Sequence, residues 1–197
     1  MSALDAVNLE AHPIGNLMDV EVLRRIRNEC RLYMTGDIKP ISESDQAAWF
    51  DTYRDYGPRV IEVWLILRTD ECADECRFIG FLSLRYYHET TRMFFETVTT
   101  QVPHATWDRG KVPGGRNEAV ITLGLTRSER DRGYGTAIYA YAREVAGCPV
   151  RAEIQNTNRR SMKAAMKAGY ETVESPTFFS TGGTIMLVGQ PTGESDG

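Results

Sequence analysis

The sequence predicts an α/β protein (α+β mixed sheet), in which a central mixed β-sheet is flanked by helices. Three observations support this class. Apolar residues recur every three or four positions near the N-terminus, two short β-branched and aromatic segments follow, and the second half alternates strand-like with helix-like segments. The expected order is two helices, two strands and an insertion, followed by strand, helix, strand, helix and strand (ααββ-insertion-βαβαβ).

Two helices are expected before the first strand. From Leu17 to Met34, apolar residues at helical spacing place one apolar face on a helix, which the segment Thr35 to Pro40 interrupts. Ser42, with Asp45 three residues later, resembles a capping box, and Trp49 and Tyr53 then share a face of the second helix.

A β-hairpin follows the helices. Val60 to Leu67 (VIEVWLIL) and Phe78 to Leu84 (FIGFLSL) are short and rich in β-branched and aromatic residues, and an acidic segment separates them. The segment from 89 to 117 is longer than a plain connection between strands, so we expect an insertion there.

The second half predicts a strand, a helix and a strand in succession. The strand is Ala119 to Thr126, the helix runs from Gly135 to Val145 before Gly147 and Pro149, and the next strand is Val150 to Gln155. This succession indicates a parallel crossover and therefore a mixed sheet. A helix through Arg160 to Ala168, ending at Gly169, and a strand from Thr184 to Val188 complete the order.

Composition limits the functional class. A chain of 197 residues with 42% hydrophobic and 25% charged residues fits one compact domain, expected over 1–189, with a disordered polar tail over 190–197. The net charge of -4 does not indicate nucleic acid binding. The N-terminus lacks a signal-peptide pattern and no apolar run is long enough for a membrane span, so a cytoplasmic protein without membrane contact is expected.

No metal site is expected. The four cysteines should be free thiols in a reducing compartment, and Cys72 with Cys76 lacks a second ligand pair nearby. The three histidines, His12, His88 and His104, show no metal-ligand spacing and favour structural or solvent roles.

The junction between the third strand and the following helix predicts an anion site. Gly133 and Gly135 allow a sharp turn and a close approach of the backbone to a ligand, and the first turn of a helix has unpaired N–H groups. These donors and the helix dipole suit a phosphate or pyrophosphate, with Arg127, Arg130 and Arg132 adding positive charge. A dinucleotide fingerprint is excluded by Ile138, and the lysine and hydroxyl residue of a P-loop are absent.

Two motifs resemble one family. Arg130, Gly133 and Gly135 match the pattern Q/R-x-x-G-x-G/A, and Asn158 stands eleven residues before the pair Gly169 and Tyr170. This part of the chain, about 119 to 173, resembles the GNAT N-acetyltransferase superfamily. The resemblance implies that the turn binds the pyrophosphate of acetyl-CoA, the acyl donor. It also implies that the preceding strand forms hydrogen bonds to the pantetheine arm through its main chain. Gly124 in this strand is consistent with a bulge or a close backbone approach. The cofactor-binding residues expected on this basis are Leu123, Gly124, Leu125, Thr126, Arg130, Asp131, Arg132, Gly133, Tyr134, Gly135, Thr136, Asn158 and Ser161.

The resemblance also implies the chemistry. Acetyl transfer to a primary amine needs a proton acceptor and a polarised carbonyl but no covalent nucleophile, so direct attack in a ternary complex is expected. Glu153 occupies the position of the general base in the ribosomal-protein alanine acetyltransferases of the family, and Glu118 is the second candidate. The position of the acid tyrosine in those enzymes is occupied here by Ala165. The proton donor to the leaving thiolate therefore stays open: it is a water or another side chain, or the thiolate is released directly.

The acceptor amine is not identified by the sequence. The insertion carries Phe94, Trp107, Arg109 and Lys111, which could form one wall of an acceptor site for a substrate with a phosphate or carboxylate, or instead a cover for the sheet or a homodimer contact. Two alternatives stay open: the same fold acting on an amine of a nucleotide or modified nucleobase, and a catalytically silent acyl-CoA-binding module.

Overall fold

The computed structural model describes residues 1–35, 39–56, 61–70, 78–87, 118–173 and 184–192. Several predictions therefore lie outside the described residues: the insertion over 89–117, the pair Cys72 and Cys76, and the end of the tail. The predicted substrate contacts Phe94, Trp107 and Arg109, with Lys111, also lie outside them, as do His88 and His104.

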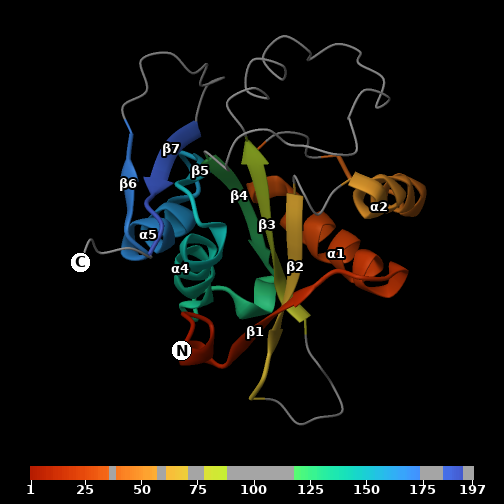
Figure 1. The fold of residues 1–197 in the computed structure, drawn as a ribbon, viewed down its shortest axis with the longest axis horizontal. Helices are drawn as coiled ribbons and strands as arrows, with labels where there is room; N and C mark the ends of the chain where they lie inside the picture. Colours follow the sequence, from red (N-terminus) through yellow and green to blue (C-terminus); the bar gives the residue numbers. More distant parts are fainter. Residues whose placement is uncertain (36–38, 57–60, 71–77, 88–117, 174–183, 193–197) are drawn as a thin grey trace.

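The described strands form one seven-stranded mixed sheet in the order β1-β2-β3-β4-β5-β7-β6 (Figure 1). All neighbouring strands are antiparallel except β4 and β5, which are parallel. The strands are β1 (Leu9–Pro13), β2 (Ile61–Arg68), β3 (Phe78–Tyr87), β4 (Glu118–Leu125), β5 (Val150–Gln155), β6 (Tyr170–Thr172) and β7 (Thr184–Gly189).

Helices cover both faces of the sheet, as the sequence predicts (Figure 1). On one face, α1 (Leu17–Cys30) and α2 (Glu43–Tyr56) pack over a core that includes Val63, Leu65 and Phe81. On the other face, α4 (Tyr134–Ala146) and α5 (Arg159–Lys167) lie over a second, larger core. Along β2, alternate residues therefore belong to different cores, Val63 and Leu65 to the first and Trp64 and Ile66 to the second.

The local signals for the helices are confirmed. The hydroxyl of Ser42 accepts a hydrogen bond of 3.1 Å from the backbone N–H of Asp45, and the rings of Trp49 and Tyr53 stack with centroids 5.1 Å apart. Helix α4 ends where Gly147 adopts a positive φ of 64°, the left-handed conformation that glycine adopts without strain.

Two strands are additional to the predicted order. β1 is an edge strand that pairs antiparallel with β2 and ends at Pro13, so its short, mixed segment LEAHP gives little periodic signal. β6 has three residues and follows α5, and it pairs antiparallel with β7. Because β6 comes between α5 and β7, β7 runs antiparallel to β5 and no second parallel pair forms.

The parallel crossover between β4 and β5 is confirmed, but the two strands pair only at their beginnings. Ala119, Val120 and Ile121 pair with Val150, Arg151 and Ala152, and no pairing of β4 with β5 follows Ile121. β4 continues to pair with β3 through Leu125. The strands thus diverge, and the edge of β4 that faces β5 becomes available to a ligand over Thr122–Leu125.

No described helix is both long enough and apolar enough to span a membrane.

Candidate active site

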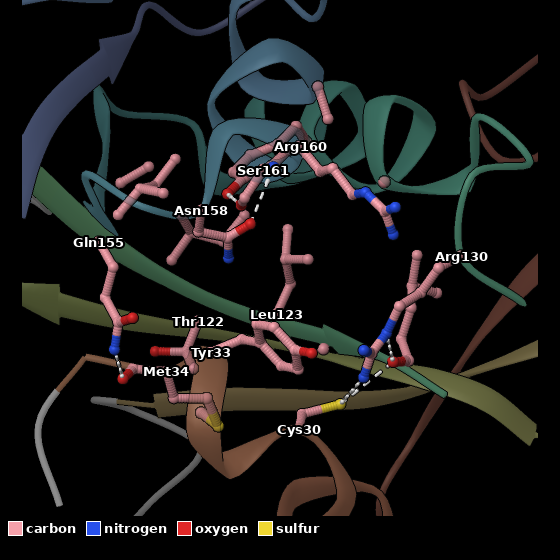
Figure 2. Close-up of a pocket in the computed structure, with 18 of the residues that line it drawn as sticks. Cys30, Tyr33, Met34, Thr122, Leu123, Arg130, Gln155, Asn158, Arg160 and Ser161 are labelled. Carbon is pink, nitrogen blue, oxygen red and sulfur yellow. Dashed lines mark hydrogen bonds between the residues drawn. The ribbon is translucent and has the colours of Figure 1, made fainter. Parts of the chain in front are cut away.

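A cavity of about 690 Å³ occupies the gap where β4 and β5 diverge. Its walls come from Ile121–Leu125 of β4, Ala152–Gln155 of β5, and the starts of α4 and α5. The end of α1 and the short 3-10 helix Arg31–Tyr33 close the side below β4 in Figure 2. The cavity is thus an elongated cleft with strand edges in its middle and two helix N-termini along one side.

The turn before α4 has the backbone of an anion site. Asp131 has a φ of 65° and Gly133 a φ of 85°, two left-handed residues close together in the chain. The N–H groups of Thr136 and Ala137 bond to the carbonyl of Gly133 at 3.0 and 3.4 Å. The N–H groups of Tyr134 and Gly135 belong to the first turn of α4, where N–H groups have no intrahelical partner and lie at the positive end of the helix dipole.

The two glycines of the motif have different roles. Gly133 needs its freedom, because its φ is one that other residues rarely adopt. Gly135 has no such requirement, since a Cβ there would meet Ala164 at 3.6 Å and Leu125 at 4.0 Å, both ordinary contacts. The absent side chain of Gly135 instead leaves cavity volume in front of the helix N-terminus.

Gly124 is a packing residue. The pairing of β3 with β4 is continuous through Gly124, so the bulge that the sequence suggested is absent. A Cβ at Gly124 would come within 2.6 Å of the Phe81 ring and 3.0 Å of the Cys30 sulfur. The missing side chain at Gly124 therefore allows α1 to pack closely against the sheet.

Arg130 lines the cleft, but its guanidinium contacts the far wall. Its Nε donates to the carbonyl of Leu125 at 3.2 Å, and the guanidinium carbon lies 4.7 Å from the ring centroid of Tyr33 (Figure 2). Cys30 bonds the same carbonyl at 3.2 Å. Tyr33 and Cys30 were missed by the sequence analysis because they stand about a hundred positions before Arg130.

Cys30 is not a nucleophile of this site. Burial raises the pKa of its thiol, and the nearby charge of Arg130 opposes that effect without reversing it. The neutral thiol donates to Leu125, which agrees with a reaction that has no covalent intermediate. Cys30 and Cys148, the cysteines among the described residues, are both buried.

Three residues predicted to bind the cofactor are not among those that line the cleft: Thr126, Arg132 and Tyr134. Tyr134 is 9% exposed and belongs to the larger core, which rules out a solvent position for its ring. Arg132 pairs instead with Glu129, whose carboxylate lies 3.6 Å from its Nη1.

Glu129 is a buried carboxylate that fixes the turn. It is 1% exposed and lies between Arg132 and Arg68, the latter at 3.9 Å. We expect Glu129→Gln to reduce the free energy of unfolding by about 1 to 3 kcal/mol, because the two arginines lose a buried counter-charge. Urea unfolding measures this, with the exposed Glu10→Gln as control; equal stability of the two variants would contradict it.

Asn158 and Ser161 open α5 on the upper side of the cleft. The Asn158 carboxamide oxygen accepts from the N–H of Ser161 at 3.2 Å, so it caps the helix, and Figure 2 shows its amide nitrogen pointing into the cleft. The Ser161 hydroxyl lies 2.8 Å from that of Tyr139, a buried residue whose ring also lines the cleft. Arg160, beside them, forms a 2.9 Å ion pair with Asp131, which joins α5 to the turn.

The two candidate bases share one arginine. Arg151 lies 3.5 Å from the carboxylate of Glu153 and 3.4 Å from that of Glu118. Glu153 lines the cleft next to the point of divergence, and its side chain is 40% exposed. Glu118 is not among the lining residues, so the geometry favours Glu153 as the group that meets a ligand.

The tyrosine position of the family pattern does not face the cleft. Ala165 is fully buried, and its neighbour Ala164 lines the cavity instead. The tyrosines that line the cleft, among the described residues, are Tyr33 and Tyr139. Burial raises the pKa of Tyr139 to about 12, so its hydroxyl remains protonated at neutral pH.

A hydrogen bond between two walls of the cleft was also missed. The carboxamide of Gln155, at the end of β5, donates to the carbonyl of Met34 at 2.7 Å (Figure 2). This bond ties the segment after α1 to the sheet edge, so the cleft has a fixed wall opposite α5. Further lining residues without a signal in the sequence are Leu32, Thr35, Thr122, Thr157 and Arg159.

Comparison with solved structures identifies the fold. Over 96% of this chain and 95% of the other, it matches a GNAT superfamily phosphinothricin acetyltransferase from Sinorhizobium meliloti in complex with AcCoA, with a TM-score of 0.62 and 16% identity. The chain has the GNAT fold. It also matches spermidine N-acetyltransferase from Vibrio cholerae in complex with CoA and spermine (TM-score 0.61, 9% identity, 92% of this chain and 94% of that one).

Two comparisons of the sequence found no match. No protein-family profile matches the chain, and no curated protein matches it. The GNAT domain of PAT from S. lividans, at 17% identity over 91% of this chain and 88% of that one, has a TM-score of 0.57. At such identities the comparison establishes the GNAT architecture alone.

Among the described residues, no group of three or more histidine, cysteine or acidic side chains is placed to hold a metal ion.

Proposed function

We propose that the protein is an acetyl-CoA-dependent N-acetyltransferase that acts on a primary amine by direct attack. The observation that carries the proposal is the divergence of β4 from β5, which opens a cleft between a free strand edge and the N-terminus of α4. An extended pantetheine arm can bond the edge of β4 in place of a strand, while its pyrophosphate meets the turn Arg130–Gly135. The structural neighbours that hold CoA or AcCoA support this arrangement.

The cofactor contacts we propose follow the cleft from its centre to its mouth. Leu123, Gly124 and Leu125 offer main-chain groups to the arm, and the helix N-termini at Gly135 and Ser161 face it from the other side. Arg130 would exchange its contact with Leu125 for the pyrophosphate, since a charged acceptor makes a stronger hydrogen bond than a carbonyl. Asn158 would donate its amide N–H to the arm.

Glu153 is the proposed base. The amine nitrogen attacks the thioester carbonyl carbon, its proton passes to the Glu153 carboxylate, and the bond from carbon to sulfur breaks to release the CoA thiolate. The thiolate then takes a proton from water or from one of the tyrosine hydroxyls that line the cleft, Tyr33 and Tyr139. A covalent acyl-cysteine is not part of this route, because Cys30 is held neutral.

A turnover assay tests the proposal. Purified protein with acetyl-CoA and a panel of primary amines should release free thiol, and mass spectrometry should find the amine heavier by one acetyl group. Isothermal calorimetry with CoA runs in parallel. Tight CoA binding without turnover on any amine would favour the catalytically silent module, and absence of CoA binding would reject both readings.

Proton return to the thiolate can be tested separately. If a tyrosine supplies the proton, either Tyr33→Phe or Tyr139→Phe should lower kcat about 10- to 100-fold while leaving acetyl-CoA affinity within a factor of a few. Tyr141→Phe is the matched control, since Tyr141 lies on the same helix as Tyr139 and packs against Trp64. Unchanged kcat in both variants would assign the step to water.

A further inference from the structure

The end of β5 presents different side chains to the two faces of the sheet, and its last four residues all line the cleft. Ala152 and Ile154 belong to the core under α4 and α5. Glu153 and Gln155 alternate with them, so their side chains belong to the opposite face, which α1 covers. Because the proposed CoA site lies along the N-termini of α4 and α5, the face with Glu153 and Gln155 is left for the amine.

The carboxamide of Gln155 is held in one orientation. Its nitrogen donates to the carbonyl of Met34 at 2.7 Å, and a carbonyl oxygen can only accept, so this contact fixes which end of the carboxamide is the nitrogen. Figure 2 shows the oxygen of Gln155 turned toward the middle of the cleft. No residue that the structure describes donates a hydrogen bond to that oxygen. The half-buried Gln155 therefore offers the cleft a fixed acceptor that has room for a ligand N–H.

The spacing of Glu153 and Gln155 suits a single nitrogen. Residues two positions apart in a strand have Cα atoms about 6 to 7 Å apart, and their side chains share a face. Glutamate and glutamine side chains also have the same length. Since an N–H···O hydrogen bond measures about 2.9 Å between nitrogen and oxygen, a nitrogen midway between the two side chains can reach both. Such a nitrogen would donate one N–H to each.

We propose that Gln155 binds the acceptor amine and selects primary amines, with its Oε1 accepting one N–H while the Glu153 carboxylate accepts the other. The lone pair then attacks the thioester carbon, the proton at Glu153 passes to that carboxylate, and the bond from carbon to sulfur breaks to release the thiolate. The N–H at Gln155 stays on the amide product. A secondary amine has one N–H and would leave the Gln155 oxygen without a partner. This inference rests on the proposed acetyl transfer and names a specificity residue for it.

Pairs of amines test the selection. Each primary amine that the protein acetylates is compared with its N-methyl derivative, in the wild type and in Gln155→Met, which keeps the length of the side chain without its oxygen. We expect the substitution to lower kcat/KM for the primary amine about tenfold, because one hydrogen bond is lost, and to change that of the N-methyl amine little. An equal loss for both amines would overturn the proposal and leave acetyl transfer intact.

Gln155→Glu separates amine binding from the bond to Met34. This variant keeps an acceptor oxygen and loses the N–H that donates to Met34. If Gln155 binds the amine, KM for the primary amine should stay within a few-fold of the wild-type value, whereas Gln155→Met should raise it about tenfold. Asn156→Met is the control, because Asn156 is the next residue, is exposed and is not among those that line the cleft. Equal increases of KM in the two Gln155 variants would make Gln155 a structural residue and reject its role.

A binding measurement does not depend on turnover. Calorimetry titrates the same primary amines into CoA-saturated protein, and we expect affinity about tenfold weaker in Gln155→Met and unchanged in Asn156→Met. This result without acetylation of any amine would reject the proposed transfer and keep the amine site. Equal affinity of the wild type and Gln155→Met, or absence of binding by every primary amine, would reject the amine site itself.

Discussion

Gly135→Leu should abolish measurable CoA binding in a protein that still folds. The leucine side chain would extend from the first turn of α4 into the cleft, where it would cover the N–H groups that we expect to meet the pyrophosphate. Loss of two charge-assisted hydrogen bonds corresponds to about a 100-fold or greater loss of affinity. Isothermal calorimetry with CoA measures it.

Gly135→Ala is the matched control for this experiment. Its Cβ meets only ordinary contacts, at 3.6 Å to Ala164 and 4.0 Å to Leu125, and alanine is the better helix former by about 0.5 to 1 kcal/mol. The alanine variant should therefore be at least as stable as the wild type in urea unfolding and bind CoA more weakly. Unchanged CoA affinity in the leucine variant would place the pyrophosphate elsewhere.

Glu153→Gln should lower kcat by about 10²- to 10⁴-fold, the usual contribution of a positioned proton acceptor. The amide keeps the shape of the side chain in the cleft but cannot take the proton of the attacking amine. Calorimetry should show acetyl-CoA affinity close to that of the wild type, because the proposed phosphate contacts lie at the other end of the cleft.

Glu118→Gln is an unusually close control for the base. Glu118 and Glu153 pair with the same arginine, so either substitution removes one of the two carboxylates that Arg151 contacts. If Glu153 is the base, the Glu118 variant should lose less than about tenfold in kcat, an effect of the altered pairing alone. A larger loss in the Glu118 variant than in the Glu153 variant would transfer the role of base to Glu118.

The N-terminus of α4 illustrates what local sequence can predict. The two glycines, the basic residues before them and the apolar spacing after them indicate a strand, a tight turn and a helix, and these all appear where expected. Each of these features depends on neighbours within a few residues, so the pattern along the chain contains the necessary information. Only the three-dimensional structure separates the roles of Gly133 and Gly135. Gly133 is needed for its backbone conformation, whereas Gly135 leaves space that a side chain would fill.

The sequence analysis missed two strands because of their length and position. β1 and β6 are short, with five and three residues, and lie at the two edges of the sheet, where pairing on one side alone demands little of the sequence. Arg132, which the sequence analysis placed among the cofactor-binding residues, lies beside the buried carboxylate of Glu129, and its cofactor role stays a prediction.

The sequence by itself determined the class of fold and the positions of the turn before α4 and of Glu153 on β5, because periodicity and short motifs are local properties. Only the tertiary structure decided how far β4 and β5 pair, and hence the cleft. It also brought Tyr33 to Arg130 and Cys30 to the carbonyl of Leu125, contacts between residues that stand far apart in the chain. Such contacts depend on how α1 packs across the sheet, which no spacing within either segment records.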